Sequence, residues 1–290
     1  MAGNVHRPNV RDHTDHGAGP NRQDQGRLMT NQPAASQDLS SLDKSLRDEL
    51  YCIADSKLVL AGWYMIVLPN GRAISDWSAL CAMMQGQYGQ ARALYQYIGR
   101  YGITREETEW TREAADIKSP KLLDTPPTSW SDFIVTAYLA EQAILTQLDS
   151  YRSFDADRTL SRLASKVHRE SRFHHSYMAG WIKALRKDPG ASVDRHFQQR
   201  FADMLDWWGD DSQPDPLFQA GYRDASEAQL RQRFIDSVSE LFKVSDLDPP
   251  VANSSPGRAW KRSIRREGQG GIPASLFEVI RFKNIELALP

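Results

Sequence analysis

Five polar residues, Gln87, Gln90, Glu141, Ser171 and His174, fall at positions where the surrounding sequence pattern is apolar. A carboxylate and an imidazole are good metal ligands, whereas glutamine and serine mainly donate and accept hydrogen bonds. Burying a polar group costs free energy unless the group finds a partner. We therefore expect these side chains to meet, either as a hydrogen-bond network or around a metal held by Glu141 and His174.

The elements that must position these side chains are three amphipathic stretches. Apolar residues recur at three- and four-residue steps in residues 75–99, 129–150 and 160–185, a spacing that predicts helices. Each stretch carries one or two of the five polar residues near the centre of its apolar stripe. Three helices with polar groups at comparable depth predict a helical bundle with a polar site in its core.

Di-iron helical bundles take one Glu from each of two helices and a Glu-x-x-His pair from each of the other two. Here the spacing is kept but the residues differ, because Gln87-x-x-Gln90 and Ser171-x-x-His174 stand at the paired positions. Two irons carry several positive charges, which Glu141 and His174 alone do not offset. We expect a largely dismantled metal site that holds no cofactor, with iron as the metal if one binds.

Composition limits the class of protein. The 290 residues are 40% hydrophobic with a formal net charge of -1, and no alternating run is long enough for a strand, so we expect an all-α fold. The charge balance gives no argument for nucleic acid or membrane partners. No apolar run reaches about 18 residues, and no signal pattern begins the chain. Cys52 and Cys81, with Cys81 expected as a buried free thiol, indicate a reducing, cytoplasmic location.

The chain divides by composition into three parts. Residues 1–37 are polar and expected to be disordered, residues 38–250 form the helical domain, and residues 251–290 form a C-terminal extension. The first helix is expected from about residue 42 to 68. Its Lys57 could reach inward to Glu141, but we expect it in solvent. The basic residues clustered within 258–266 could contact an anion or an acidic partner, but we likewise expect them to form a solvated face.

Five segments together resemble a known family. The chain is similar to the phenylacetic acid catabolic protein family over roughly residues 45–250, in the segments GQARALYQY, YGITREE, PTSWSDFIVTAYLAEQAI, RESRFHHSYMAGW and SEAQLRQRFIDSV. The known members of this family are the catalytic and structural subunits of the bacterial ring-1,2-phenylacetyl-CoA epoxidase.

The resemblance implies a ferritin-like bundle. The family's catalytic subunit carries a di-iron centre that activates oxygen and epoxidises an aromatic ring held as a CoA thioester, whereas its structural subunit has the same fold without a working iron site. The resemblance places the first-helix carboxylate near Trp63 and the third-helix carboxylate on Glu141. In the structural subunit's pattern, Glu170 and His174 form a pair at four-residue spacing. The resemblance places the Glu-x-x-His pair of the second helix on Gln87 and Gln90. It places the Glu-x-x-His pair of the fourth helix on Ser171 and His174.

Three functional hypotheses follow. The first is a structural subunit that pairs with a second ferritin-like subunit of an oxygenase. The second is an enzyme whose altered metal site uses Glu141 and His174, with Glu170 and Asp55 as further ligands, and acts on an aromatic or CoA-thioester substrate in a catabolic or biosynthetic route. The third is a metal-free bundle that binds a small apolar ligand.

Overall fold

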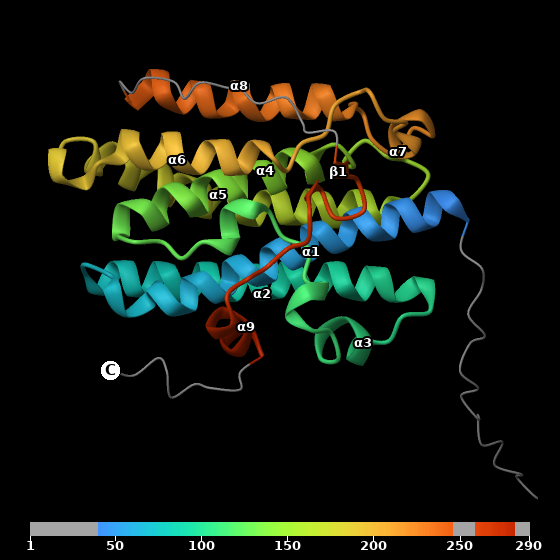
Figure 1. Cartoon of the computed structure of the whole chain (residues 1–290), viewed down its shortest axis with the longest axis horizontal. Coiled ribbons are helices and arrows are strands. Elements are labelled where there is room, and N and C mark those ends of the chain that lie inside the picture. Colours follow the sequence, from blue (N-terminus) through green and yellow to red (C-terminus); the bar gives the residue numbers. More distant parts are fainter. Residues whose placement is uncertain (1–39, 246–258, 282–290) are drawn as a thin grey trace, which may run out of the picture. The chain divides into compact units, whose positions relative to one another are not determined.

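The computed structural model describes residues 40–245 and 259–281 of the chain (Figure 1). All of these residues belong to one compact unit, Ser36–Pro290. The predicted tail 1–37 and the predicted boundary near residue 250 lie outside the described residues.

Four long helices form the centre of the fold: α1 (Ser41–Val67), α2 (Ile74–Ile98), α4 (Trp130–Asp149) and α5 (Arg158–Leu185). Helix α1 packs on α2 and α4, and α5 packs on the same two helices, so the four close into a bundle. The all-α class is therefore confirmed.

Local side-chain chemistry sets where these helices begin. The Ser129 hydroxyl accepts a hydrogen bond from the Asp132 backbone amide at 3.1 Å, which caps α4. Helix α5 is capped by Asp157, which accepts from the Thr159 amide at 2.9 Å and the Leu160 amide at 3.0 Å. Asp155, two residues earlier, suits a cap equally well by residue type, and the backbone turn decides between the two aspartates.

A second layer covers α4. Helices α6 (Val193–Leu205) and α8 (Glu227–Ser245) pack on α4, and Figure 1 shows them running beside it. As a result, every residue of α4 from Trp130 to Glu141 is buried. A helix that is apolar on all sides is expected in this position. The shorter helices are α3 (Arg105–Glu109), α7 (Pro216–Gln219) and α9 (Ala274–Ile280), and 3₁₀ turns span Leu68–Asn70, Gly99–Tyr101, Ala114–Asp116, Lys121–Asp124 and Pro189–Ala191.

Capping boxes begin helices α3 and α8. At α3, the Thr104 amide donates to Glu107 Oε2 at 2.6 Å, and the Glu107 amide donates to Thr104 Oγ1 at 3.2 Å. At α8, the Ser226 amide donates to Gln229 Oε1 at 2.9 Å, and the Gln229 amide donates to Ser226 Oγ at 3.4 Å. Such boxes can be recognised in a sequence because the motif needs only two residues that are three apart.

The described part of the C-terminal extension, residues 259–281, returns to the bundle. It forms a small antiparallel hairpin of β1 (Trp260–Lys261) and β2 (Arg266–Glu267), followed by α9, which packs on α1. The contact with α1 is close, because a Cβ added at Gly62 would lie 2.8 Å from Leu276 Cδ1. We expected no strand, and strands of two residues are too short to leave an alternating pattern.

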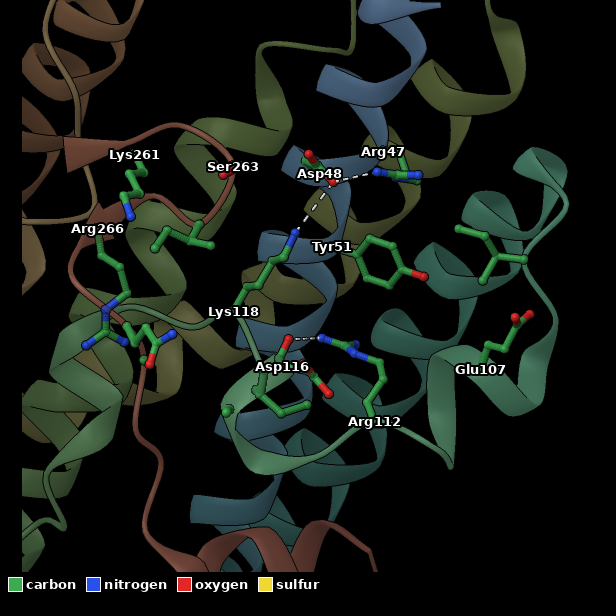
Figure 2. A pocket seen from close by; sticks show the side chains of 16 residues that line it. Arg47, Asp48, Tyr51, Glu107, Arg112, Asp116, Lys118, Lys261, Ser263 and Arg266 are labelled. Carbon is green, nitrogen blue, oxygen red and sulfur yellow. Dashed lines mark hydrogen bonds and ion pairs between the residues drawn. The ribbon is translucent and has the colours of Figure 1, made fainter. Parts of the chain in front are cut away.

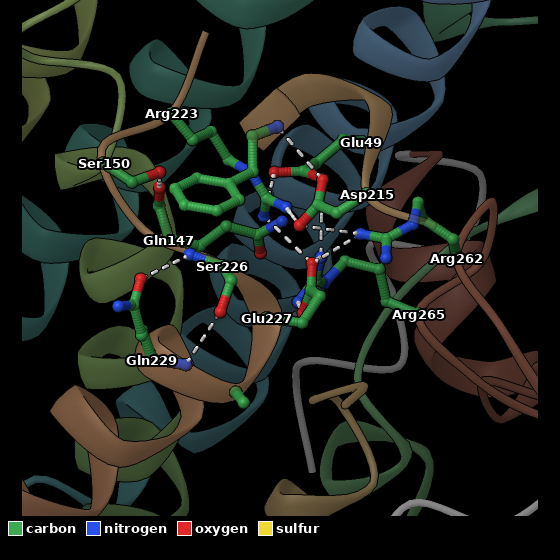
Figure 3. A network of polar contacts seen from close by, with 12 residues as sticks. Glu49, Gln147, Ser150, Asp215, Arg223, Ser226, Glu227, Gln229, Arg262 and Arg265 are labelled. Carbon is green, nitrogen blue, oxygen red and sulfur yellow. Dashed lines mark hydrogen bonds and ion pairs between the residues drawn. The ribbon is translucent and has the colours of Figure 1, made fainter. Parts of the chain in front are cut away.

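The buried Arg265 of the hairpin joins a network of ion pairs (Figure 3). Arg265 donates to both oxygens of Glu227 at 2.9 and 2.8 Å, and Arg223 joins Glu227 to Glu49 at 2.9 and 3.2 Å. Arg265 is fully buried. Burial would raise the pKa of Glu227, but Arg265 and Arg223 outweigh it and lower that pKa strongly. The predicted solvated basic face is therefore wrong for Arg265, which is an internal counter-ion.

The burial of Arg266 and of the two cysteines can also be compared with what the sequence suggested. Arg266 is also buried and pairs with Asp124, whereas Arg258 lies outside the described residues.

Cys52 is buried, which raises the pKa of its thiol to about 12. Cys81 is only partly buried, so the prediction of a buried thiol there is wrong.

One helical span, Ser41–Asn70, is long and apolar enough to cross a membrane by length and composition. However, 78% of its most apolar window is buried inside the fold, as in the core helix of a bundle, so the span is weak evidence for a membrane segment.

Candidate functional site

A cluster of polar side chains lies at the centre of the four-helix bundle, with one contribution from each helix. Glu141 Oε2 on α4 accepts from Lys57 Nζ on α1 at 2.8 Å and from Gln87 Nε2 on α2 at 2.9 Å. His174 Nδ1 on α5 lies 3.3 Å from Glu141 Oε1 and 3.2 Å from Gln87 Nε2. Lys57, Gln87 and Glu141 are completely buried, and His174 is 4% exposed.

A second set of contacts leads from this centre towards the surface. Ser171 Oγ lies 3.4 Å from Lys57 Nζ and donates to Gln90 Oε1 at 3.4 Å, while Gln90 Nε2 donates to Glu170 Oε2 at 3.4 Å. The Glu170 side chain is 44% exposed. The structure therefore links all six predicted polar residues, with Glu141 at the buried end and Glu170 at the rim.

The expected Glu170–His174 bridge along α5 is not among the contacts of the described residues. Glu170 instead turns towards Gln90 and lies 3.8 Å from Lys166 Nζ. His174 turns inward to Glu141. Four-residue spacing brings two side chains to one helix face, but here each side chain is held by other partners.

The electrostatics of the centre are those of a buried ion pair. Burial would raise the pKa of Glu141, but the charge of Lys57 and the contact with His174 outweigh that effect and hold the pKa well below its ordinary value. Burial lowers the pKa of Lys57, and the charge of Glu141 offsets part of this shift. Each charge is stabilised chiefly by the other, because both side chains are completely buried.

The prediction made for Lys57 from the sequence is wrong. We expected it in solvent, and the structure buries it against Glu141. A signal was present, because Lys57 follows Ile53 by four residues and precedes Ala61 by four, and both belong to the apolar stripe of α1. The long aliphatic stem lets a lysine occupy such a position if its ammonium finds a carboxylate.

Two other first-helix predictions are also corrected. The position opposite Glu141 is Lys57 rather than a residue near Trp63, since the Trp63 indole donates to the Leu123 carbonyl at 3.0 Å. Asp55 is not free to bind a metal. Its carboxylate accepts from the Tyr95 hydroxyl at 2.5 Å, from Arg112 at 2.7 Å and from the Lys118 amide at 2.7 Å.

The donor set does not fit a di-iron centre. Within residues 40–245 and 259–281, no group of three or more His, Cys, Asp or Glu side chains is arranged to hold a metal ion. Glu141 is the one carboxylate in the described centre, and Lys57 Nζ already lies 2.8 Å from its Oε2. An ammonium repels a metal ion and offers it no lone pair while protonated.

Several surface cavities surround the described fold. One of about 640 Å³ lies between α1, the 103–118 segment and the hairpin (Figure 2). Its cations are largely paired within the protein, since Lys118 lies 3.5 Å from Asp48 and Arg47 lies 3.1 Å from the same carboxylate. Its lining does not include Lys57, Glu141 or His174.

A smaller, more apolar cavity of about 310 Å³ lies between α2 and α3 and includes the half-exposed Trp110. This cavity is the place among the described residues where the apolar-ligand hypothesis finds space. Trp207 and Trp208 are completely buried and pack in the core instead.

The chain matches a family model, whereas a comparison with curated proteins gives no match. The family model described as phenylacetic acid catabolic protein matches residues 29–263, which include all four bundle helices and the polar centre. That range exceeds the part over which the sequence segments suggested the resemblance. The chain therefore belongs to the phenylacetic acid catabolic protein family.

Proposed function

We propose that the chain is a non-catalytic, ferritin-like subunit of a multicomponent oxygenase of the phenylacetyl-CoA epoxidase type. The observation that carries the proposal is the Lys57 ammonium, 2.8 Å from Glu141 in the centre of the bundle. In this position a fixed protein cation neutralises the carboxylate that a metal would otherwise need.

The remaining residues support the same role. Gln87 supplies a neutral amide where a di-iron bundle has a carboxylate, and it donates to Glu141 as a hydrogen-bond partner. A connected polar network of this kind favours one helix register, because a shifted helix would leave buried groups unpaired. In this proposal the polar centre fixes the register of the bundle helices in a subunit that serves as a scaffold.

A scaffold subunit acts through its partner. In this proposal the chain pairs with a second ferritin-like subunit that carries the metal and the reaction, and an aromatic CoA thioester binds to that assembly in the cytoplasm. The proposal is supported by the family, whose known members include both kinds of subunit, and by the donor set around Glu141.

The test is metal content together with assembly. The protein is produced with iron supplied, and bound metal is measured by plasma mass spectrometry. We expect metal at background level, no oxygen consumption with a reductase, and a stable pair with the ferritin-like protein encoded beside it, seen by light scattering. A lone monomer under co-expression would contradict the scaffold role.

The runner-up function is an oxygenase with an altered metal site. The observation that favours it is the 3.3 Å approach of His174 Nδ1 to Glu141 Oε1, which places two good ligands together. One or two irons per chain in the same measurement would establish this reading and show that Lys57 moves aside.

A further inference from the structure

The outward face of α5 is unusually rich in cations. Arg158, Arg162, Lys166 and Arg169 follow one another at steps of four, four and three residues, so they share one side of the helix, and all are exposed. The buried residues of α5, such as Leu160, lie on the opposite side. Arg172 and Lys183 extend the same exposed side. We call these six residues the α5 cationic ridge.

The acidic residues of α5 itself do not balance this ridge. Glu170 is the only Asp or Glu in Arg158–Leu185, and it already accepts from Gln90 and lies 3.8 Å from Lys166. Within the described residues, no ion pair joins an acid to Arg158, Arg162, Arg169, Arg172 or Lys183. The whole chain has 36 Lys and Arg against 37 Asp and Glu, so the ridge is a local excess rather than a property of the chain.

An isolated ridge of this kind is unfavourable by itself. Like charges at four-residue spacing on a helix destabilise it. Phe173 lies within the ridge, four residues after Arg169, and is 51% exposed. Arginine and large aromatic residues are the types enriched at the centres of protein interfaces, where lysine is depleted. Four of the six ridge cations are arginine.

We infer that the α5 cationic ridge, with Phe173 at its middle, is the docking surface for an acidic face of a partner protein. The identity of that partner rests on the proposed function, under which it is the second ferritin-like subunit. Charge complementarity selects this occupant. A second copy of this chain would bring an identical cationic ridge against the first, and such an isologous contact would set like charges together.

The experiment compares charge-reversed variants of the full chain in binding to the co-encoded ferritin-like subunit. Arg162→Glu/Arg169→Glu reverses two ridge cations, and Lys44→Glu/Arg195→Glu reverses two exposed cations on α1 and α6 as a control with the same change in charge. We expect the ridge variant to raise the Kd about 100-fold at low salt and the control to leave it unchanged. Equal Kd values for both variants would overturn the inference.

Two further variants separate charge from contact. Arg162→Gln/Arg169→Gln should raise the Kd about tenfold and flatten its salt dependence. Phe173→Ala should raise the Kd while leaving the salt dependence as it is in the wild type, because it removes apolar contact alone. Circular dichroism checks that each variant keeps its helices.

The failure of the inference and the failure of the proposed function are distinguishable. A wild-type chain that forms no complex contradicts the scaffold role. The ridge is then tested with poly-L-glutamate, which should bind the wild type and the Lys44→Glu/Arg195→Glu control but not the ridge variant. Equal binding by all three, or stronger binding of duplex DNA or phosphatidylserine vesicles at the ridge, would overturn the assignment to a protein partner.

Discussion

Lys57 Nζ and Glu141 Oε2 lie 2.8 Å apart with both side chains fully buried, one on α1 and the other on α4. Taking two charges out of water is costly, and their attraction offsets that cost only when further hydrogen bonds complete the site. Gln87 and His174 complete it on the Glu141 side, and Ser171 lies 3.4 Å from the ammonium. The pair therefore joins α1 and α4 at the polar centre of the bundle.

The first prediction concerns stability. Lys57→Met leaves Glu141 as an uncompensated buried charge, so we expect the free energy of unfolding to fall by about 3–5 kcal/mol. Adding Glu141→Gln removes the charge and should restore most of the loss. Urea denaturation measures both, with the exposed Lys44→Met as control. A single Lys57→Met variant as stable as the wild type would show that the pair does not form.

The second prediction concerns acid. The folded-state pKa of Glu141 lies well below its unfolded value of about 4.3. Its contribution to stability is therefore present above that unfolded value and is lost as pH falls through the folded-state pKa. We expect the stability of the wild type to fall more steeply below about pH 4.3 than that of Lys57→Met/Glu141→Gln. Parallel curves from urea denaturation across this range would contradict the assignment.

The third prediction concerns metal. Lys57→Glu replaces the ammonium by a carboxylate facing Glu141 and His174, which gives one His and two carboxylates, a ligand set that suits a divalent transition metal. We expect this variant to bind up to about one Mn²⁺ or Fe²⁺ per chain while the wild type binds none. Equilibrium dialysis with plasma mass spectrometry measures it, and Lys57→Gln serves as the control without a carboxylate.

The fourth prediction uses two neighbouring glycines of α2. A Cβ at Gly89 would meet nothing within 4 Å, so Gly89→Ala should raise stability by about 0.5–1 kcal/mol through helix propensity. A Cβ at Gly86 would lie 3.0 Å from His174 Nε2, so Gly86→Ala should lose that gain by displacing the imidazole. Thermal unfolding of the two variants compares them directly. A Gly86→Ala variant more stable than Gly89→Ala would show that His174 does not pack there.

The fifth prediction tests the hairpin network. Arg265 donates to both oxygens of Glu227 and is fully buried, so Arg265→Ala should lower the free energy of unfolding by about 3–5 kcal/mol. Lys261→Ala, at an exposed neighbour in the same hairpin, should change it by less than about 0.5 kcal/mol. Equal effects in chemical denaturation would place Arg265 outside the buried network.

Periodicity in the sequence was enough to predict the helices and the depth of Gln87, Glu141 and His174. A helix places residues three and four apart on one face, so an interruption of the apolar stripe marks a polar position in the core. The capping boxes at Thr104 and Ser226 were equally local. These features depend only on residues a few positions apart in the chain, so they can be recognised from the sequence.

The partners of those residues were decided by tertiary structure. Lys57 and Glu141 are separated by 84 residues, and only the packing of α1 on α4 brings them together. The same applies to Arg265, whose partners Glu49 and Glu227 lie on α1 and α8. A lysine or arginine is as compatible with solvent as with a buried carboxylate, because a flexible side chain follows whichever environment stabilises its charge. The sequence alone determined the helical bundle and its polar centre, whereas the three-dimensional packing determined that a lysine ammonium neutralises that centre.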